Sequence, residues 1–213
     1  MPIFQALDYL GTVAFAISGA LVAINKRMDI LGMIVLALAT AIGGGTVRDL
    51  LLHRDVFWLQ DSVYVLLSVA AALYVFLRHH AIVPAARALR IWDAVGLGVF
   101  TAIGAMKAQE AGCNLTGIVV MACLTGVGGG MIRDLLARDI PFVLCEQVYA
   151  SACILGAFAF WGMTQVGANQ TAIICVTAGL TTAVRLLSIA RNWGLPKAQQ
   201  RLGPTHPDRP EGP

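Results

Sequence analysis

The sequence predicts an all-α integral membrane protein with seven transmembrane helices, arranged as two inverted three-helix repeats followed by a seventh helix. Three observations lead to this prediction. Hydrophobic residues make up 58% of the 213 residues and charged residues only 13%, whereas an ordinary soluble domain is roughly 25% charged. The apolar residues gather in windows long enough to cross a bilayer. The first part of the chain also resembles the second.

Seven apolar windows follow one another, separated by short polar segments. A transmembrane helix needs about 20 predominantly apolar residues, so we expect one helix in each window. The windows cover residues 4–24, 30–52, 62–77, 91–108, 115–137, 142–166 and 171–190. Residues 192–213 hold five of the eight prolines and almost no apolar run, so we expect a disordered tail there.

The basic residues indicate the orientation, because short cytoplasmic loops carry an excess of lysine and arginine. With the N-terminus outside, most basic residues fall in inner segments: Lys26, Arg27, Arg78, Arg87, Arg90, Arg138, Arg191, Lys197, Arg201 and Arg209. The outer segments then hold Arg54 beside three acidic residues, Asp55, Asp61 and Glu110. We therefore expect an N-terminus outside and a cytoplasmic C-terminus.

A comparison of the chain with itself shows an internal duplication. Residues 8–51 align with residues 93–136 without a gap, and 17 of the 44 positions are identical. Each repeat unit, which extends beyond these aligned residues to the next apolar window, holds three expected helices, and because three is odd the second unit enters the membrane from the opposite face. Such inverted repeats are typical of transporters and channels. The expected units are residues 1–90, residues 91–167, a seventh helix over residues 168–191 and the tail over residues 192–213.

Each copy carries three consecutive glycines in its second helix. They are Gly43, Gly44, Gly45, Gly128, Gly129 and Gly130. A glycine in a helix costs about 1 kcal/mol relative to alanine, so each triplet needs a reason. One alternative is close approach of neighbouring helices. The other is a kink or local unwinding that exposes carbonyl oxygens to a water-lined path. Matching positions in both repeats favour the second alternative, and free carbonyl oxygens suit a cation.

An aspartate begins each repeat and an Arg-Asp pair follows each triplet: Asp8, Arg48 and Asp49 in the first, Asp93, Arg133 and Asp134 in the second. Each leading aspartate lies at the expected membrane depth of the arginine in its own repeat. We therefore predict two ion pairs, one near each mouth of a path: Asp8 with Arg48, and Asp93 with Arg133. One alternative is that these ion pairs hold neighbouring helices together. The other is that their charges close the mouths or tune cation entry, and both roles can hold at once.

Four further polar residues lie in or near the expected helices. Thr40 and Thr125, three residues before each triplet, either present hydroxyls to a pore or donate to their own helix backbone. Lys107, near the outer end of the fourth helix, extends to the membrane interface or responds to voltage. Arg185, near the inner end of the seventh helix, extends to the interface or pairs with Asp134.

Several functions lack support in the sequence. The net charge of +3 is small and scattered, so we expect no nucleic-acid partner. The five cysteines lie in or beside apolar runs, and none has a nearby histidine at metal-ligand spacing, so we expect no metal or cofactor. No nucleophile and base pair or phosphate loop stands out, and the chain is not expected to be an enzyme.

Two repeats that each carry Gly-Gly-Gly-x-x-Arg-Asp-Leu-Leu in a seven-helix protein resemble the prokaryotic TRIC family, the trimeric intracellular cation channels. Each half also resembles a bacterial repeat domain labelled as a glycine transporter. The resemblance implies a homotrimer in a bacterial inner membrane, in which every protomer has its own pore for K+ and Na+. It also implies that the second and fifth helices line this pore and bend at their triplets, with the Arg-Asp pairs beside it.

Animal members of the family have a Lys-Glu-Val motif where this chain has a triplet, so the lipid and calcium regulation of that branch is not implied here. The leading interpretation is a passive channel for monovalent cations. The alternative is a secondary transporter of a small solute such as glycine, because broken helices in inverted repeats serve alternating access equally well. A third possibility is a structural membrane protein without transport. The expected partners are membrane lipid and further copies of the chain.

Overall fold

The structure, a computed structural model, describes residues 2–78, 85–145, 148–191 and 193. These residues form nine helices: α1 (Pro2–Asn25), α2 (Ile30–Leu51), α3 (Phe57–Gln60), α4 (Val63–Arg78), α5 (Ala85–Glu110), α6 (Leu115–Leu136), α7 (Phe142–Cys145), α8 (Ala150–Gln165) and α9 (Gln170–Arg191). The tail expected over residues 192–213 lies outside the described residues, apart from Trp193.

Among the described residues, five helices are long and apolar enough to cross a membrane: α1, α2, α5, α6 and α9. The chain is therefore an all-helical membrane protein, as predicted. Helix α4 is apolar but has only 16 residues. The single helix expected over residues 142–166 is wrong at its start, because this window divides into the short α7 and the longer α8. Phe142 begins α7 with its backbone N–H donating to Asp134 of α6, 2.9 Å away.

Helices α2 and α6 begin in the same way. The side chain of Asp29 accepts a hydrogen bond from Gly32 N at 2.7 Å, and that of Asn114 accepts one from Gly117 N at 2.9 Å. Such caps satisfy backbone donors that the first turn leaves free. Turns with positive φ precede and follow both helices: Arg27 (55°) and Gly112 (75°) before them, His53 (50°) and Arg138 (58°) after them. Residues 85 positions apart in the sequence thus also have the same local structure at the ends of these two helices.

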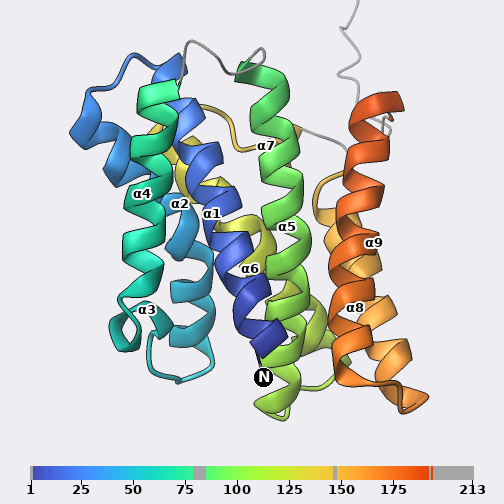
Figure 1. Cartoon of the computed structure of the whole chain (residues 1–213). Coiled ribbons are helices and arrows are strands. Elements are labelled where there is room, and N and C mark those ends of the chain that lie inside the picture. The colour runs from blue at the N-terminus through green and yellow to red at the C-terminus, as the bar shows by residue number, and fades with distance from the viewer. Residues whose placement is uncertain (1, 79–84, 146–147, 192, 194–213) are drawn as a thin grey trace, which may run out of the picture.

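Successive long helices alternate in direction (Figure 1). Helix α1 rises from the N-terminus, α2 descends, α4 rises, α5 descends, α6 rises, α8 descends and α9 rises. Helices α1 and α5 lie centrally: α1 packs against α2, α4 and α5, and α5 packs against α6, α8 and α9. Helix α2 also packs along α6, which joins the two halves of the chain.

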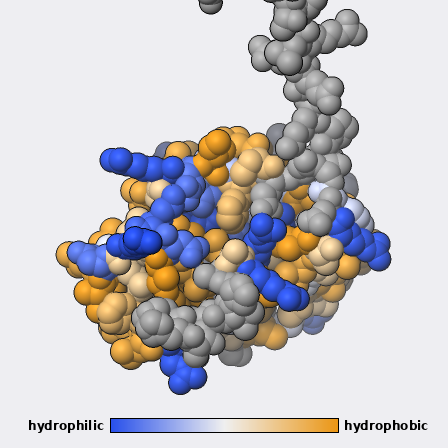
Figure 2. All heavy atoms as spheres, turned by 90° about the horizontal axis from the view of Figure 1, so that it is seen from above, coloured by the Kyte–Doolittle hydropathy of each residue, from blue (hydrophilic) through white to orange (hydrophobic). Residues whose placement is uncertain are grey.

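The core and the outer surface are both apolar. Phe15 of α1 packs against Phe100 of α5 with ring centroids 5.2 Å apart, inside a cluster of buried aliphatic side chains. Large apolar side chains such as Leu31, Leu66 and Leu77 remain exposed on the flanks. Seen from above, this end of the molecule carries several patches of hydrophilic residues with hydrophobic residues between them (Figure 2). Exposed apolar flanks of this kind suit a surface surrounded by lipid.

Candidate functional site

The two glycine triplets meet where α2 crosses α6. A Cβ atom added to Gly44 would lie 2.5 Å from the carbonyl oxygen of Thr125 and 3.0 Å from the backbone nitrogen of Gly129. One added to Gly128 would lie 3.1 Å from the Cα atom of Gly44. The backbones approach this closely because the contact holds no side chains, as in other small-residue helix interfaces. Close approach is thus one role that the structure shows for the triplets.

The local unwinding expected at the triplets is absent from α2 and α6. Residues 43–45 and 128–130 are helical, within helices that run unbroken from residue 30 to 51 and from residue 115 to 136. The expected local unwinding is therefore wrong for this conformation, whereas the expected kink at the triplets stays a prediction. At Gly44, Gly128 and Gly129 the backbone of the partner helix occupies the space that a side chain would take. Gly43, at the edge of the contact, faces the side chain of Ile132.

The last glycine of each triplet makes room for an aromatic side chain. A Cβ atom at Gly45 would lie 2.6 Å from the ring of Phe57, and one at Gly130 would lie 2.8 Å from the hydroxyl oxygen of Tyr149. Both aromatic residues belong to the polar clusters described next. The triplets thus serve two contacts at once, one with the opposite triplet and one with an aromatic residue at the end of the helix.

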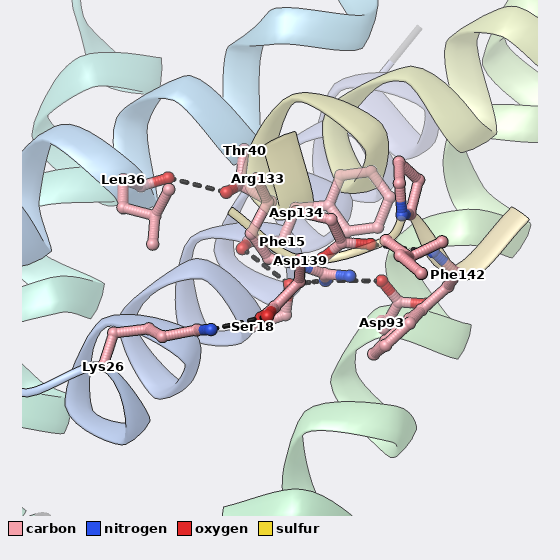
Figure 3. A network of polar contacts seen from close by, with 12 residues as sticks. Phe15, Ser18, Lys26, Leu36, Thr40, Asp93, Arg133, Asp134, Asp139 and Phe142 are labelled. Atoms are coloured by element: carbon pink, nitrogen blue, oxygen red, sulfur yellow. Dashed lines mark hydrogen bonds and ion pairs between the residues drawn. The ribbon is translucent and has the colours of Figure 1, made fainter. Parts of the chain in front are cut away.

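The hydroxyls of Thr40 and Thr125 donate within their own helices. Thr40 Oγ1 donates to the carbonyl oxygen of Leu36 and Thr125 Oγ1 to that of Met121, both at 2.6 Å (Figure 3 shows the first). Both threonines are fully buried. Of the two alternatives for these residues, the structure shows donation to the helix backbone.

A buried polar cluster surrounds Arg133 near the end of α6 (Figure 3). Its Nη1 donates to Asp93 Oδ1 at 2.6 Å and to Ser18 Oγ at 2.9 Å, and its Nε donates to Asp134 Oδ1 at 2.8 Å. Asp134 Oδ2 accepts the backbone N–H of Phe142. The predicted ion pair between Asp93 and Arg133 is confirmed, and charged hydrogen bonds from three helices hold this guanidinium in place.

Two aromatic rings complete the cluster. The guanidinium carbon of Arg133 lies 4.8 Å from the ring centroid of Phe142, a favourable distance for a cation and an aromatic face. Tyr149 Oη donates to Asp93 Oδ1 at 3.2 Å. Asp93 therefore accepts from two groups, and a loss of its charge would affect both.

Arg185 of α9 lies on the other side of Tyr149. Its guanidinium carbon is 4.8 Å from the ring centroid of Tyr149, and its Nη1 donates to the carbonyl oxygen of Val148 at 3.2 Å. The residue is only 2% exposed, so the expectation that it extends to the membrane interface is wrong. The partners that the structure describes for it do not include Asp134. Arg185 instead ties α9 to the segment before α8.

A second cluster surrounds Arg48 at the end of α2, near the opposite end of the bundle. Arg48 Nε donates to Asp49 Oδ1 at 2.7 Å, and Asp49 Oδ2 accepts the backbone N–H of Phe57 at 3.1 Å. The guanidinium carbon lies 5.5 Å from the ring centroid of Phe57. Tyr64 Oη donates to Asp8 Oδ2 at 2.8 Å. Each of these contacts has its counterpart 85 residues later around Arg133.

The predicted ion pair between Asp8 and Arg48 is wrong. Among the described residues these two side chains form no salt bridge, although both are buried. Asp8 is held by the hydroxyl of Tyr64, and Arg48 by its neighbour Asp49. In the other cluster the hydroxyl of Ser18 helps to hold the guanidinium beside its aspartate. The residue that corresponds to Ser18 in the second repeat is Ile103, which has no acceptor to offer.

Exposed ion pairs link loops at the two ends of the bundle. Lys26 Nζ lies 2.5 Å from Asp139 Oδ1 at one end, and Arg54 Nη1 lies 3.0 Å from Glu110 Oε2 at the other. Lys107 Nζ also reaches Glu110 at 3.5 Å. Lys107 is partly exposed near the end of its helix, and its proposed response to voltage stays a prediction.

Sequence reasoning did not identify five residues of the two clusters: Phe57, Tyr64, Phe142, Tyr149 and Ser18. The signal for the four aromatic residues was present, because each pair is separated by the same 85 residues. The self-comparison ended at residue 51 and did not reach them. The role of Ser18 has no sequence signal, because it belongs to one repeat and contacts the other.

The fold and these clusters define a helical membrane protein with two similar halves and a buried Arg-Asp centre in each. A family model described as glycine transporter matches residues 5–80 and residues 90–165. The UPF0126 inner membrane protein YadS of Escherichia coli K12 is 45% identical over 156 residues, which cover 70% of this chain and 73% of YadS. The chain therefore belongs to the glycine transporter family, which includes bacterial UPF0126 membrane proteins.

Two solved structures match almost the whole chain. The TRIC trimeric intracellular cation channel orthologue from Rhodobacter sphaeroides has a TM-score of 0.87 and 34% sequence identity, covering 91% of this chain and 100% of the channel. A second structure, described as giving the structural basis for conductance through TRIC cation channels, has a TM-score of 0.86 and 33% identity, covering 94% and 100%. The resemblance to the prokaryotic TRIC family, inferred from the duplicated motif, is confirmed.

Proposed function

We propose that this protein is a cation channel for K+ and Na+, with one path in each protomer between α2 and α6. The observation that carries the proposal is the placement of a buried Arg-Asp cluster at each end of the α2 and α6 pair. Ionisable residues at membrane depth usually face a cavity or an ion path. The likeness to solved TRIC cation channels, at about a third sequence identity, supports the same function.

The glycine contact suits a path that opens and closes. In this conformation α2 and α6 touch through the backbone at their triplets, so ions pass only if the two helices bend or separate there. At Gly44 and Gly128 the opposite helix presents only backbone atoms, so no side chains interdigitate at these two positions, and the ring of Phe15 from α1 lies against Gly129. Together with Arg185 beside Tyr149, the two clusters hold four buried carboxylates and three guanidinium groups, and this excess of negative charge favours cations over anions at the mouths.

The membrane arrangement is part of the proposal. We infer seven crossing helices, an N-terminus outside, a cytoplasmic C-terminus, and inverted repeats over residues 1–90 and 91–167 followed by a seventh helix. The alternating helix directions, the contacts repeated 85 residues apart and the double match of the family model support this arrangement. We also infer a homotrimer in a bacterial inner membrane, which the trimeric relative and the name of YadS support. The crossing helices are α1, α2, α4, α5, α6, α8 and α9.

A second candidate function is secondary transport of a small solute such as glycine. The description of the matching family model favours it. Inverted repeats with flexible helices can alternate access as well as form a pore. The two candidates differ in one measurable property, because a channel passes many ions in each opening whereas a transporter saturates with its solute.

Recording from the purified protein in a planar bilayer with symmetric KCl separates the two functions. The channel proposal expects discrete unitary currents that persist when KCl is replaced by NaCl. Saturable glycine uptake into proteoliposomes, without unitary currents, would overturn it in favour of transport. If the protein shows neither unitary currents nor glycine uptake, a structural role without transport remains.

The proposed path is tested by Gly44→Leu and Gly129→Leu, which place a side chain in the contact between α2 and α6. Both are expected to abolish conduction. Gly162→Leu in α8 is the matched control, because a Cβ atom there has nothing within 4 Å. Size-exclusion chromatography checks that each variant is folded and has the size of the wild type. Unchanged currents in folded Gly44→Leu protein would show that ions take another route.

A further inference from the structure

A groove with a volume of about 520 Å³ lies between the start of α5 and the end of α9. Its apolar wall consists of two residues of α5 and three of α9: Ala86, Ile91, Leu186, Ile189 and Ala190. Two arginines of α5, Arg87 and Arg90, complete the lining. The groove therefore combines an apolar wall with two positive charges, and it is separate from the α2 and α6 pair.

The two arginines are available to a ligand. Both are exposed, and neither has a hydrogen-bond or ion-pair partner among the described residues. They are three residues apart on one helix, so their side chains emerge from the same face. Guanidinium groups bind phosphate oxygens through two parallel N–H donors. Arg191, which follows the groove in α9, lies instead over the ring of Trp193, 5.9 Å from its centroid.

The position of the groove identifies the kind of ligand. The start of α5 and the end of α9 lie at the same end of the bundle (Figure 1), so the arginines are at the level expected for lipid headgroups. Below them the groove wall continues into helices long and apolar enough to cross the bilayer. A molecule that fits both parts carries a negative phosphate at one end and a hydrocarbon chain at the other.

We propose that this groove binds an anionic phospholipid of the surrounding bilayer, with its phosphate on Arg87 and Arg90 and an acyl chain along Ile91, Leu186 and Ile189. A basic residue near a membrane surface contributes about fivefold to the binding of anionic lipid. Two arginines are therefore expected to favour an anionic lipid over a zwitterionic one by about 25-fold. The binding is independent of whether the protein conducts ions.

Native mass spectrometry of the full-length protein tests the site directly. The protein in detergent is titrated with dioleoyl phosphatidylglycerol or with dioleoyl phosphatidylcholine, and the fraction of lipid-bound protein is compared. Wild-type protein is expected to prefer phosphatidylglycerol, and the double variant Arg87→Gln with Arg90→Gln is expected to lose most of this preference. Arg78→Gln, at the end of α4, is the matched control, because it removes an exposed arginine outside the groove. This variant is expected to keep the preference for phosphatidylglycerol.

A second variant tests the acyl chain. Ala190→Trp narrows the groove but keeps both arginines, and it is expected to weaken phosphatidylglycerol binding about as much as the double variant does. Unchanged binding in Ala190→Trp would show that surface charge alone attracts the lipid, and would overturn the proposed groove. The proposal also fails if wild-type protein shows no preference, or if the double variant keeps it. If the preference for phosphatidylglycerol appears only after residues 194–213 are removed, the tail of the chain occupies the groove instead of a lipid.

Discussion

Gly44→Ala is the smallest change that tests the contact between α2 and α6. The added methyl carbon would lie 2.5 Å from the carbonyl oxygen of Thr125, whereas ordinary contacts of a Cβ atom begin near 3.4 Å. The neighbouring atoms belong to the backbone of α6, so no flexible side chain can turn away. The two helices must therefore move apart by about 0.9 Å at their crossing to accept the methyl group.

The expected loss of stability follows from two opposing effects. Forcing an extra methyl group into a well-packed contact costs about 1–3 kcal/mol. Replacing glycine by alanine within a helix returns up to about 1 kcal/mol. With the middle of the first range and the full gain of the second, the net free energy of unfolding should fall by about 1 kcal/mol, which lowers the melting temperature of a chain of this size by about 2–4 °C.

Thermal unfolding in detergent, followed by fluorescence or circular dichroism, measures this loss. Gly179→Ala in α9 is the matched control, because a Cβ atom there has nothing within 4 Å. The control is expected to melt at the wild-type temperature or above it. The reasoning is refuted if Gly44→Ala melts at or above the wild-type temperature, because the helices would then have room for a side chain at their crossing.

Four further changes test the polar contacts by the same thermal measurement. Asp93→Asn removes the partner of a fully buried arginine and should lower the free energy of unfolding by about 3 kcal/mol. Asp8→Asn breaks no salt bridge among the described residues and should lower it clearly less. Equal losses in the two variants would contradict the structure. Tyr149→Phe removes one hydrogen bond and should cost about 1 kcal/mol, and no loss would mean that the bond contributes nothing. Lys26→Ala opens an exposed pair with Asp139 and should cost at most about 1 kcal/mol, vanishing in high salt; a larger, salt-independent loss would contradict this interpretation.

The helices could be predicted from the sequence because their causes are local. An apolar stretch in lipid must satisfy its own backbone hydrogen bonds, and a helix does so within one segment. The division between α7 and α8 was not predictable in this way. The start of α7 is fixed instead by a tertiary contact, because the backbone N–H of Phe142 donates to the carboxylate of Asp134 in another segment.

The candidate site was only partly predictable. The duplication identified the glycine triplets and the six charged residues, because a repeated motif marks positions that both halves require. It also implied that both halves form the same ion pair, which is wrong for Asp8 and Arg48. The halves differ at one position, Ser18 against Ile103, and a single hydroxyl is one difference between the surroundings of the two guanidinium groups.

The sequence by itself determined that this is a membrane protein, that it is helical, and that its two halves share a motif of glycine, arginine and aspartate. Composition and periodicity suffice for this because they reflect the solvent and the local backbone. Only the tertiary structure decided that the triplets touch across α2 and α6, and that Ser18 contacts Arg133 across 115 residues of chain. Such contacts depend on which sides of two helices are turned toward each other, and the packing of the whole bundle determines this orientation.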